Sequence, residues 1–281
     1  MKYLKVWFAI FGTLFALNTF AQNYFDGGDD KYKPLLGQEG KDVIWMPTSN
    51  ELLAIMLKTA KVTPNDLVYD LGSGDGRIAI AAAKDFGARA IGIEFNPQMA
   101  ALAQRNADRS GVGDRVKIIN GDIFVEDFSK ATVVTMYLLP DLNISLRPTI
   151  LKMKPGTRVT SHAFNMGDWE PDIEIDSPTK AFFWVVPAQV EGEWVISGME
   201  PKSRAILKLS QHYQKIGGNL QLGSNSQPIL NPKLDGATLS FSYIDRSKIP
   251  HFVKVAVNNN EISGVDKSTG YYDIEITGKR R

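Results

Sequence analysis

A glycine-rich turn between an apolar strand and an alanine-rich helix constrains this chain more than any other segment. Leu67–Leu71 (LVYDL) is a short apolar run typical of a buried strand, and it leads directly into Gly72-Ser73-Gly74-Asp75-Gly76. Residues 77–86 continue with an alanine-rich helical pattern. Glycine admits positive φ and lets a ligand approach the backbone, and a helix N-terminus presents free N–H groups. The segment therefore predicts a ligand-binding turn at the carboxyl edge of a parallel sheet.

Strand-like and helix-like patterns alternate along the rest of this half of the chain. Four further apolar runs are predicted as strands, at Ala88–Glu94, Val116–Asn120, Ala131–Leu138 and Arg158–Phe164. Such an alternation predicts an α/β domain with a parallel sheet and right-handed crossovers.

Two helix starts can be read from the sequence. Asn96 is a typical N-cap and Pro97 a typical first helical residue, and this helix is expected to stop at Gly111. Thr48 and Glu51 have the spacing of a capping box, which predicts that an earlier helix begins at Thr48.

The spacing of the glycines argues against a dinucleotide site. A dinucleotide fingerprint requires a third glycine where this chain has Arg77. Asp70 and Asp75 also place negative charge where a pyrophosphate would lie. The same carboxylates suit the α-ammonium group of an amino-acid ligand.

Two more acidic residues follow neighbouring strands. Glu94 ends the second strand, where a carboxylate can accept hydrogen bonds from both hydroxyls of a ribose. Asp122 follows the third strand. The carboxylate of Asp122 can accept a hydrogen bond from the exocyclic amine of an adenine, while the backbone N–H of Ile123 contacts a nitrogen of the adenine ring. A ligand with an amino acid, a ribose and an adenine but no phosphate satisfies this order. S-adenosylmethionine (SAM) is such a ligand.

These motifs also resemble a known family. The runs VYDLGSGDGRIAIAAAK, GIEFNP and GD are similar to those of class I SAM-dependent methyltransferases. The resemblance is closest to the protein-lysine methyltransferases that modify the c-subunit of ATP synthase, and to their prokaryotic relatives. It extends from Trp45 to about Pro187 and is supported by Met46-Pro47-Thr48, Leu138-Leu139-Pro140 and Asp168-Trp169. It implies a Rossmann-like, seven-stranded methyltransferase domain.

The resemblance also implies roles for individual residues. Pro47 and Thr48 would cover the methionine end of SAM, and Asn96 would serve mainly as a helix cap with a secondary role at the ligand. The residues expected to bind SAM are therefore Thr48, Asp70, Gly72, Ser73, Gly74, Glu94, Asn96, Asp122 and Ile123.

The methyl acceptor is less well defined than the cofactor. Tyr137 and Trp169 are candidates for the acceptor pocket, although Tyr137 is equally consistent with a core aromatic. No dedicated general base is visible, and His162 fits a core histidine better than a base. We expect methylation of a nitrogen, with protein lysine as the preferred acceptor. The alternatives are a small-molecule or envelope-lipid acceptor, and a non-catalytic SAM-binding protein.

Composition excludes several other classes of site. The chain has no cysteine and only three histidines, so we expect no disulfide and no metal site. Lys and Arg number 32 against 31 Asp and Glu, a near-neutral balance that argues against nucleic acid as a partner.

The N-terminus has the pattern of an export signal. Lys2 and Lys5 precede an apolar run at Val6–Leu17, and the segment ends on a small residue at Ala21. The run is shorter than the roughly 20 residues of a membrane span. We expect a signal peptide over residues 1–21, export to the periplasm and no stable membrane span after cleavage. An uncleaved signal anchor is the alternative. Residues 22–42 are polar and predict a linker or surface arm.

The C-terminal third changes character. After the methyltransferase-like region at 43–187, residues 188–281 contain almost only short alternating runs separated by Gly, Asn and Pro. This pattern predicts a small all-β domain, a barrel or a sandwich. Its role stays open between a stabilising or oligomerising appendage and a recognition module. The six strands expected are Glu193–Ser197, Ala205–Gln211, Asn219–Leu222, Thr238–Tyr243, Phe252–Val257 and Tyr272–Thr277.

Overall fold

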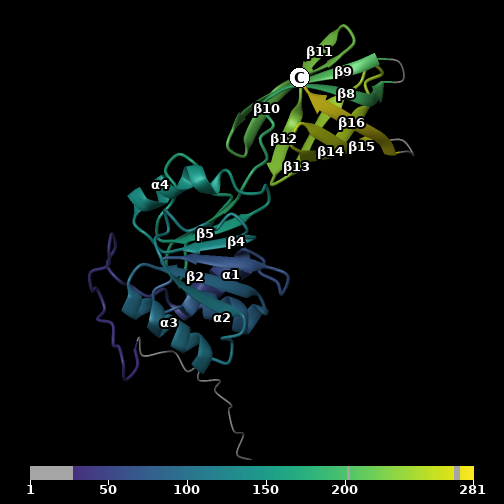
Figure 1. Cartoon of the computed structure of the whole chain (residues 1–281). Coiled ribbons are helices and arrows are strands. Elements are labelled where there is room, and N and C mark those ends of the chain that lie inside the picture. Colours follow the sequence, from purple (N-terminus) through teal and green to yellow (C-terminus); the bar gives the residue numbers. More distant parts are fainter. Residues whose placement is uncertain (1–27, 201–202, 269–272) are drawn as a thin grey trace, which may run out of the picture.

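The computed structural model describes residues 28–200, 203–268 and 273–281, which form two lobes (Figure 1). The predicted signal peptide at residues 1–21 lies outside the described residues. The two β-sheets, one in each lobe, are joined by residues 186–191. The predicted Rossmann-like domain of seven strands, followed by an all-β domain, is confirmed.

The first lobe is built on a seven-stranded sheet with the order β3-β2-β1-β4-β5-β7-β6. β1 to β5 are parallel to one another, and β7 runs antiparallel to both β5 and β6. The carboxyl ends of β1 to β4 therefore meet at one edge. The strands are β1 (Leu67–Leu71), β2 (Arg89–Glu94), β3 (Val116–Asn120), β4 (Val133–Met136), β5 (Arg158–His162), β6 (Ile173–Ile175) and β7 (Ala181–Val185).

Helices cover both faces of this sheet. Alternate residues of each strand point to opposite faces, so Val68 packs with α1, α2 and α3, while its neighbour Tyr69 packs with α4. Burial on both faces explains why the central strands are almost continuously apolar. The helices are α1 (Asn50–Thr59), α2 (Arg77–Phe86), α3 (Pro97–Arg109) and α4 (Pro140–Ile150).

One predicted helix cap is confirmed and the other is wrong. The side chain of Asn96 accepts hydrogen bonds from the backbone N–H groups of Gln98 and Met99, and Pro97 begins α3. At α1 the cap is Ser49, whose hydroxyl accepts from the N–H of Leu52. The side chain of Thr48 is instead buried inside the lobe, where it has a hydrogen-bond partner of its own.

The second lobe is a nine-stranded antiparallel sheet with the order β11-β10-β9-β8-β16-β15-β14-β13-β12. The sheet curls until it is nearly closed, so the predicted small barrel is the better of the two expected forms. The strands are β8 (Gly192–Glu200), β9 (Ser203–His212), β10 (Lys215–Leu222), β11 (Asn225–Pro228), β12 (Leu230–Asp235), β13 (Thr238–Ile244), β14 (Pro250–Asn258), β15 (Glu261–Ser268) and β16 (Asp273–Arg280).

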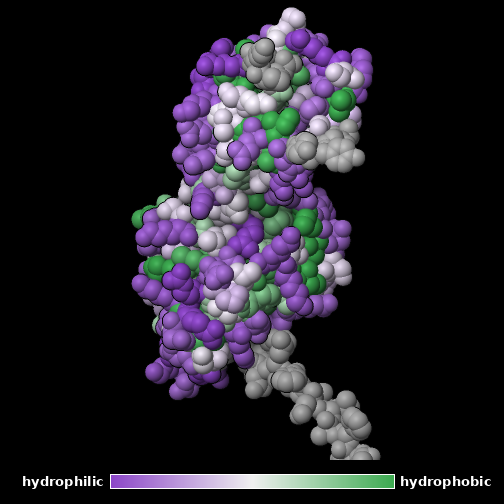
Figure 2. Space-filling view, turned by 90° about the vertical axis from the view of Figure 1, so that its right-hand side faces the viewer, coloured by the Kyte–Doolittle hydropathy of each residue, from purple (hydrophilic) through white to green (hydrophobic). Residues whose placement is uncertain are grey.

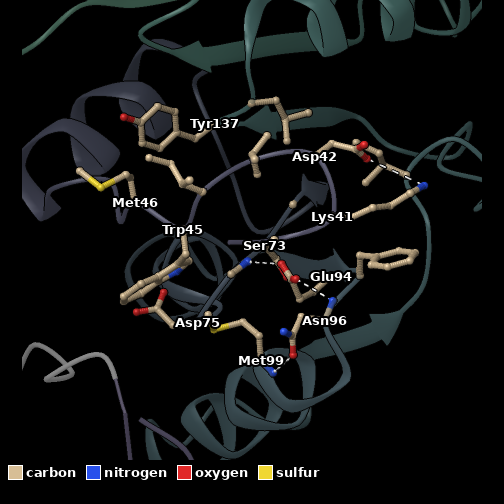
Figure 3. A pocket seen from close by; sticks show the side chains of 18 of the residues that line it. Lys41, Asp42, Trp45, Met46, Ser73, Asp75, Glu94, Asn96, Met99 and Tyr137 are labelled. Carbon is tan, nitrogen blue, oxygen red and sulfur yellow. Dashed lines mark hydrogen bonds and ion pairs between the residues drawn. The ribbon is translucent and has the colours of Figure 1, made fainter. Parts of the chain in front are cut away.

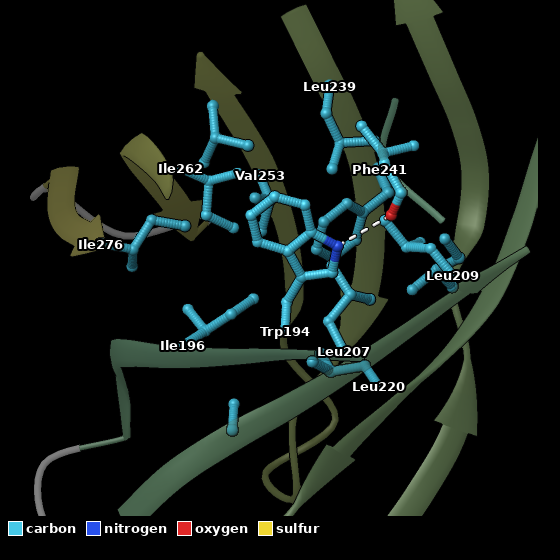
Figure 4. Packing of buried hydrophobic residues seen from close by; sticks show 14 of the residues in the cluster. Trp194, Ile196, Leu207, Leu209, Leu220, Leu239, Phe241, Val253, Ile262 and Ile276 are labelled. Carbon is cyan, nitrogen blue, oxygen red and sulfur yellow. Dashed lines mark hydrogen bonds between the residues drawn. The ribbon is translucent and has the colours of Figure 1, made fainter. Parts of the chain in front are cut away.

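The interior of the second lobe is apolar and centres on Trp194 (Figure 4). The indole N–H of this buried residue donates to the carbonyl oxygen of Val190 at 2.8 Å. All six predicted strands are present, although Tyr272 lies outside the described residues. Three strands were missed, namely β11, β12 and β15.

The two lobes meet through the tip of the β9–β10 hairpin. Trp169, which follows β5, is fully buried, and its indole N–H donates to Oε1 of Gln214 at 2.9 Å. The Trp169 ring also stacks on Tyr213, whose hydroxyl donates to Asp168 at 3.1 Å. These contacts fix the second lobe against the segment that follows β5.

The surface of both lobes is mixed. Hydrophilic residues predominate on the face shown in Figure 2, with apolar residues between them. In the part of the chain that the structure describes, no helix has both the length and the apolar character needed to cross a membrane.

Candidate functional site

A cavity lies at the carboxyl edge of the parallel strands (Figure 3). Its space, including the open mouth, is about 970 Å³. The structure brings together around it ten of the residues proposed from the sequence, which are Thr48, Asp70, Gly72, Ser73, Gly74, Glu94, Asn96, Asp122, Ile123 and Tyr137. The ligand contacts proposed for these residues stay predictions, but their convergence on one cavity is a property of the fold.

The glycine turn is shaped by close neighbours. Gly72 and Gly74 both have positive φ, of 74° and 54°. A Cβ atom on Gly72 would lie 2.9 Å from the side chain of Leu138, and one on Gly74 would lie 2.9 Å from the indole nitrogen of Trp45. Any larger residue would therefore be strained at both positions by its backbone conformation, and one at Gly74 would also press against the indole ring of Trp45.

Glu94 ties β2 to the glycine turn. Its two carboxylate oxygens accept hydrogen bonds from the backbone N–H groups of Gly74 and Asn96, both at 2.9 Å. Burial raises the pKa of Glu94, and these hydrogen bonds oppose the shift. The carboxylate is thus held in a fixed position in the cavity wall, and its predicted contact with a ribose stays a prediction.

Asp70 is buried at the end of β1. Its Oδ1 accepts a hydrogen bond from the hydroxyl of Thr135 at 2.6 Å. Burial raises the pKa of Asp70 to about 7, the Thr135 hydrogen bond opposes this, and the nearby charges of Asp75 and Glu94 add to it. A cationic group entering the cavity would favour the ionised carboxylate.

Arg77 explains why the third glycine of a dinucleotide turn is absent. Its guanidinium pairs with the buried carboxylate of Asp75 at 2.6 Å and donates to the backbone carbonyl of Thr48 at 3.1 Å. Arg77 therefore joins the glycine turn to the segment before α1, and its guanidinium is the counter-charge of the buried Asp75 carboxylate.

Part of the segment predicted as a linker or surface arm (22–42) contributes to the site, together with residues 43–46, which the sequence assigned to the methyltransferase domain. We call residues 28–46 the N-terminal arm. The ammonium of Lys41 lies 2.7 Å from Oδ2 of Asp122 and above the ring of Phe95. The hydrogen bond with Lys41 lowers the pKa of Asp122. The apolar triplet Ile44-Trp45-Met46, at the end of a polar stretch, was the available signal that this segment packs against the domain.

A second contact anchors the start of the arm to α3. The carboxylate of Asp29 lies 2.6 Å from Arg105 and 2.9 Å from Arg109. The hydrogen bond with Arg105, aided by the one with Arg109, holds the pKa of Asp29 far below its usual range. The arm is therefore anchored at two places, at Asp122 beside the cavity and at the C-terminal half of α3.

Of the two acceptor-pocket candidates, only Tyr137 lines the cavity. Its ring contacts that of His162, with centroids 3.8 Å apart. Trp169 does not line this cavity, because it is buried beneath the hairpin of the second lobe. Its side chain links the two lobes and is not exposed to a ligand in the cavity.

The charge of the lining suits a cationic ligand. Six carboxylates line the cavity, against the two basic side chains of Lys41 and Arg77. The hydroxyl of Ser73 is buried and has no hydrogen-bond partner among the described residues. This acidic lining suits a sulfonium and an ammonium group and disfavours a phosphate. The carboxylates are Glu39, Asp42, Asp70, Asp75, Glu94 and Asp122.

Comparison with known proteins agrees with this chemistry. The family model described as the ANTKMT methyltransferase domain matches residues 70–173. A protein-lysine N-methyltransferase from Saccharolobus islandicus is 47% identical over 131 residues, which cover 46% of this chain and 81% of that protein. The chain belongs to the protein-lysine N-methyltransferase family.

Other relatives of this methyltransferase are more distant. A mouse lysine N-methyltransferase, named for the c-subunit of ATP synthase, is 36% identical over 106 residues, covering 37% of this chain and 42% of that protein. The human enzyme of the same name is 31% identical over 129 residues, covering 46% of this chain and 54% of that protein. The chain thus spans only about half of these vertebrate relatives, and the family model ends before the second lobe.

A solved structure identifies the cofactor. The chain is similar to a crystal structure described as an RNA methyltransferase from Salinibacter ruber in complex with S-adenosylhomocysteine (SAH), the demethylated product of SAM. The identity is 46%, the TM-score is 0.51, and the match covers 52% of this chain and 96% of that one. This protein is a SAM-dependent methyltransferase, and the acid-lined cavity has the chemistry to hold that cofactor.

Proposed function

We propose that this methyltransferase transfers the methyl group of SAM to the ε-amine of a lysine in a protein. The observation that supports this most directly is the acid-lined cavity, which attracts a cationic side chain to the same edge of the sheet as the cofactor. The relatives named as lysine methyltransferases make lysine the favoured acceptor.

The cavity wall supplies what such a transfer requires. SAM supplies an activated methyl group on a positively charged sulfur. The neutral lysine nitrogen uses its lone pair to form the new C–N bond while the C–S bond breaks and its electrons stay on sulfur. The methylated ammonium then releases a proton to solvent. The apolar surface of Met46, Leu138 and Leu142 desolvates the incoming amine and so lowers its pKa.

The protein's contribution is then alignment of donor and acceptor, which can account for most of the rate enhancement. The glycine turn, Glu94 and Asp122 are placed to hold the nucleoside. Tyr137, which lines the same cavity, is the candidate for the residue beside the transferred methyl group. A dedicated base is not required if the amine enters already neutral, because the methylated ammonium can then release its proton to solvent.

The decisive experiment incubates the purified protein with methyl-labelled SAM and a cell-envelope extract. We expect labelled protein bands that yield methyl-lysine on acid hydrolysis, and no label with Glu94→Ala. Label that is removed by ribonuclease would favour RNA, the acceptor named for the Salinibacter ruber protein. Label confined to the organic phase would favour a lipid or small molecule. Binding of SAM without any transfer would favour a non-catalytic role.

We also propose that the chain is exported to the periplasm. The basic residues and the short apolar run of residues 1–21 support this. The N-terminal mass of the protein from its own cells, together with cell fractionation, tests the proposal. A mature N-terminus at Gln22 in the periplasmic fraction is expected. An intact N-terminus in the membrane fraction would indicate a signal anchor, and an intact N-terminus in the cytoplasmic fraction would contradict export.

A further inference from the structure

His162, which the transfer chemistry does not use, contacts two residues that line the cavity, Thr48 and Tyr137. His162 ends β5 and is only 7% exposed. Its Nδ1 lies 3.0 Å from the hydroxyl of Thr48, and its Nε2 lies 3.3 Å from the hydroxyl of Thr179. Its ring contacts the ring of Tyr137. One side chain thus touches both the segment before α1 and the residue that follows β4.

The imidazole is neutral in this setting. Burial lowers the pKa of His162 to about 4. A neutral imidazole has one N–H donor and one acceptor nitrogen. Both partners are hydroxyls, which can donate or accept. If Thr48 donates to Nδ1, then the Nε2–H donates to Thr179, and every polar atom of the ring is paired.

This arrangement has a consequence for Thr48. When the hydroxyl of Thr48 donates its hydrogen bond to Nδ1 of His162, the lone pairs of the Thr48 oxygen remain available to accept a hydrogen bond from a donor in the cavity. An α-ammonium group is such a donor. The sulfonium cofactor therefore meets an oriented acceptor at this position in addition to the carboxylate of Asp70.

The order of strands places Thr48 at the amino-acid end of the cofactor. Asp122 follows β3 at one side of the sheet, and Glu94 ends β2 next to it. His162 and Tyr137 belong to β5 and to the end of β4, on the opposite side of β1. With the adenine near Asp122 and the ribose near Glu94, the methionine part extends toward Thr48.

We propose that His162 is a positioning residue, which orients the hydroxyl of Thr48 toward the amino-acid end of SAM and holds the ring of Tyr137 beside the transferred methyl group. The proposal concerns the cofactor side of the site and does not depend on which acceptor the enzyme uses.

The test compares two ligands on one variant. His162→Phe keeps an aromatic ring against Tyr137 but removes both hydrogen bonds. SAH carries the amino-acid end, whereas 5′-methylthioadenosine has the same nucleoside without it. We expect calorimetry to show that the variant binds SAH about tenfold more weakly, the effect of about one hydrogen bond to a charged group. Affinity for methylthioadenosine should stay within about twofold.

Thr160→Val is the matched control. Thr160 lies on the same strand, is fully buried, and its hydroxyl has no hydrogen-bond partner among the described residues. This variant should bind both ligands as the parent does. An equal loss of both ligands in His162→Phe would mean a general structural defect and would overturn the proposal, as would unchanged SAH binding.

Thr179→Val provides an independent variant should His162→Phe fail to fold. It removes the partner of Nε2 but leaves the imidazole in place, so we expect a smaller loss that is again confined to SAH. Nitrogen NMR of the parent should show the proton of His162 on Nε2. A proton on Nδ1, or equal effects of Thr179→Val on both ligands, would contradict the proposed orientation of Thr48.

Discussion

Lys41 of the N-terminal arm and Asp122, which follows β3, form an ion pair in the cavity lining, with Nζ of Lys41 2.7 Å from Oδ2 of Asp122 although the residues are 81 apart in the sequence. Asp122 is the carboxylate expected to accept the amine of adenine. If Asp122 has that role, the ammonium of Lys41 competes with the ligand for this carboxylate. The N-terminal arm is thus part of the cavity wall, and a cofactor that binds Asp122 would have to displace or share this ion pair.

Replacing Lys41 with methionine should strengthen SAH binding. The substitution keeps an unbranched side chain but removes the charge that competes for Asp122, so we expect about a two- to fivefold gain at low ionic strength. The gain should shrink at high ionic strength, where the ion pair is screened. Calorimetry at two salt concentrations measures both effects.

Lys33→Met, on an exposed lysine of the same arm, is the control and should leave SAH binding unchanged. Weaker binding by Lys41→Met would show that this lysine helps to hold the nucleoside.

Asp70 should make cofactor binding depend on pH. Its pKa is raised to about 7 in the free protein, chiefly by burial. A cationic ligand favours the ionised form, so affinity for SAH should rise by up to about tenfold per pH unit below pH 7 and level off above it. Binding near neutral pH should release a proton, detectable as a calorimetric enthalpy that changes with the buffer.

The same shift has a consequence for the stability of the unliganded protein. Because the folded state holds a proton that the unfolded state loses near pH 3.8, stability should fall as the pH rises from about 4 to about 7. Asp70→Asn should remove this part of the pH dependence from both binding and stability. An unaltered pH profile in this variant would exclude Asp70 as its source.

Glu94→Gln should weaken the nucleoside site as a whole. The carboxylate of Glu94 accepts hydrogen bonds from the backbone N–H groups of Gly74 and Asn96, one on each oxygen. The amide of glutamine has only one oxygen and can replace only one of these two hydrogen bonds. We expect about a tenfold or greater loss of affinity for SAH and for methylthioadenosine alike, with a loss of about 1–3 kcal/mol in the free energy of unfolding. Isothermal calorimetry and chemical denaturation measure the two effects.

Glu51→Gln, at an exposed position in the first turn of α1, is the matched control: it should leave both affinities unchanged and lower the free energy of unfolding by no more than about 0.3–1 kcal/mol. Retained affinity for methylthioadenosine in Glu94→Gln would contradict the ribose role of Glu94.

Gln214→Ala should loosen the junction between the lobes. It leaves the buried indole N–H of Trp169 without its acceptor, which costs about 1–3 kcal/mol. We expect thermal unfolding to begin earlier and to separate into two transitions, with SAH affinity unchanged because Gln214 does not line the cavity. Gln189→Ala, on an exposed side chain, should have no effect. A single transition at the parent's temperature would show that this contact does not couple the lobes.

Much of the first lobe could be predicted because its signals are local. The strand, the glycine turn and α2 follow one another directly, and the structure has β1 and α2 at the expected residues. The cap at Asn96 depends on atoms two and three residues away. Convergence of Asp70, Glu94 and Asp122 follows from the rule that parallel strands end at one edge.

The strands of the second lobe are harder to predict from the sequence than those of the first lobe, because several of them lack an alternating apolar pattern. β15 contains Gly264, Asp266 and Lys267, residues that are rare in strands. Asp266 is nevertheless fully buried, since the hydroxyl of Tyr243 donates to it at 2.6 Å and Nδ1 of His251 lies 2.9 Å away. These partners come from other strands, so the sequence around Asp266 does not reveal them.

By itself, the sequence determined β1 to β5, the glycine turn and the acidic residues that follow β1, β2 and β3, because each of these signals depends on neighbours close along the chain. Only the tertiary structure decided that the N-terminal arm covers this site, that Trp169 is buried between lobes, and that His162 contacts Thr48. Each of these depends on a contact across tens of residues, whose partner is selected by packing and charge in three dimensions.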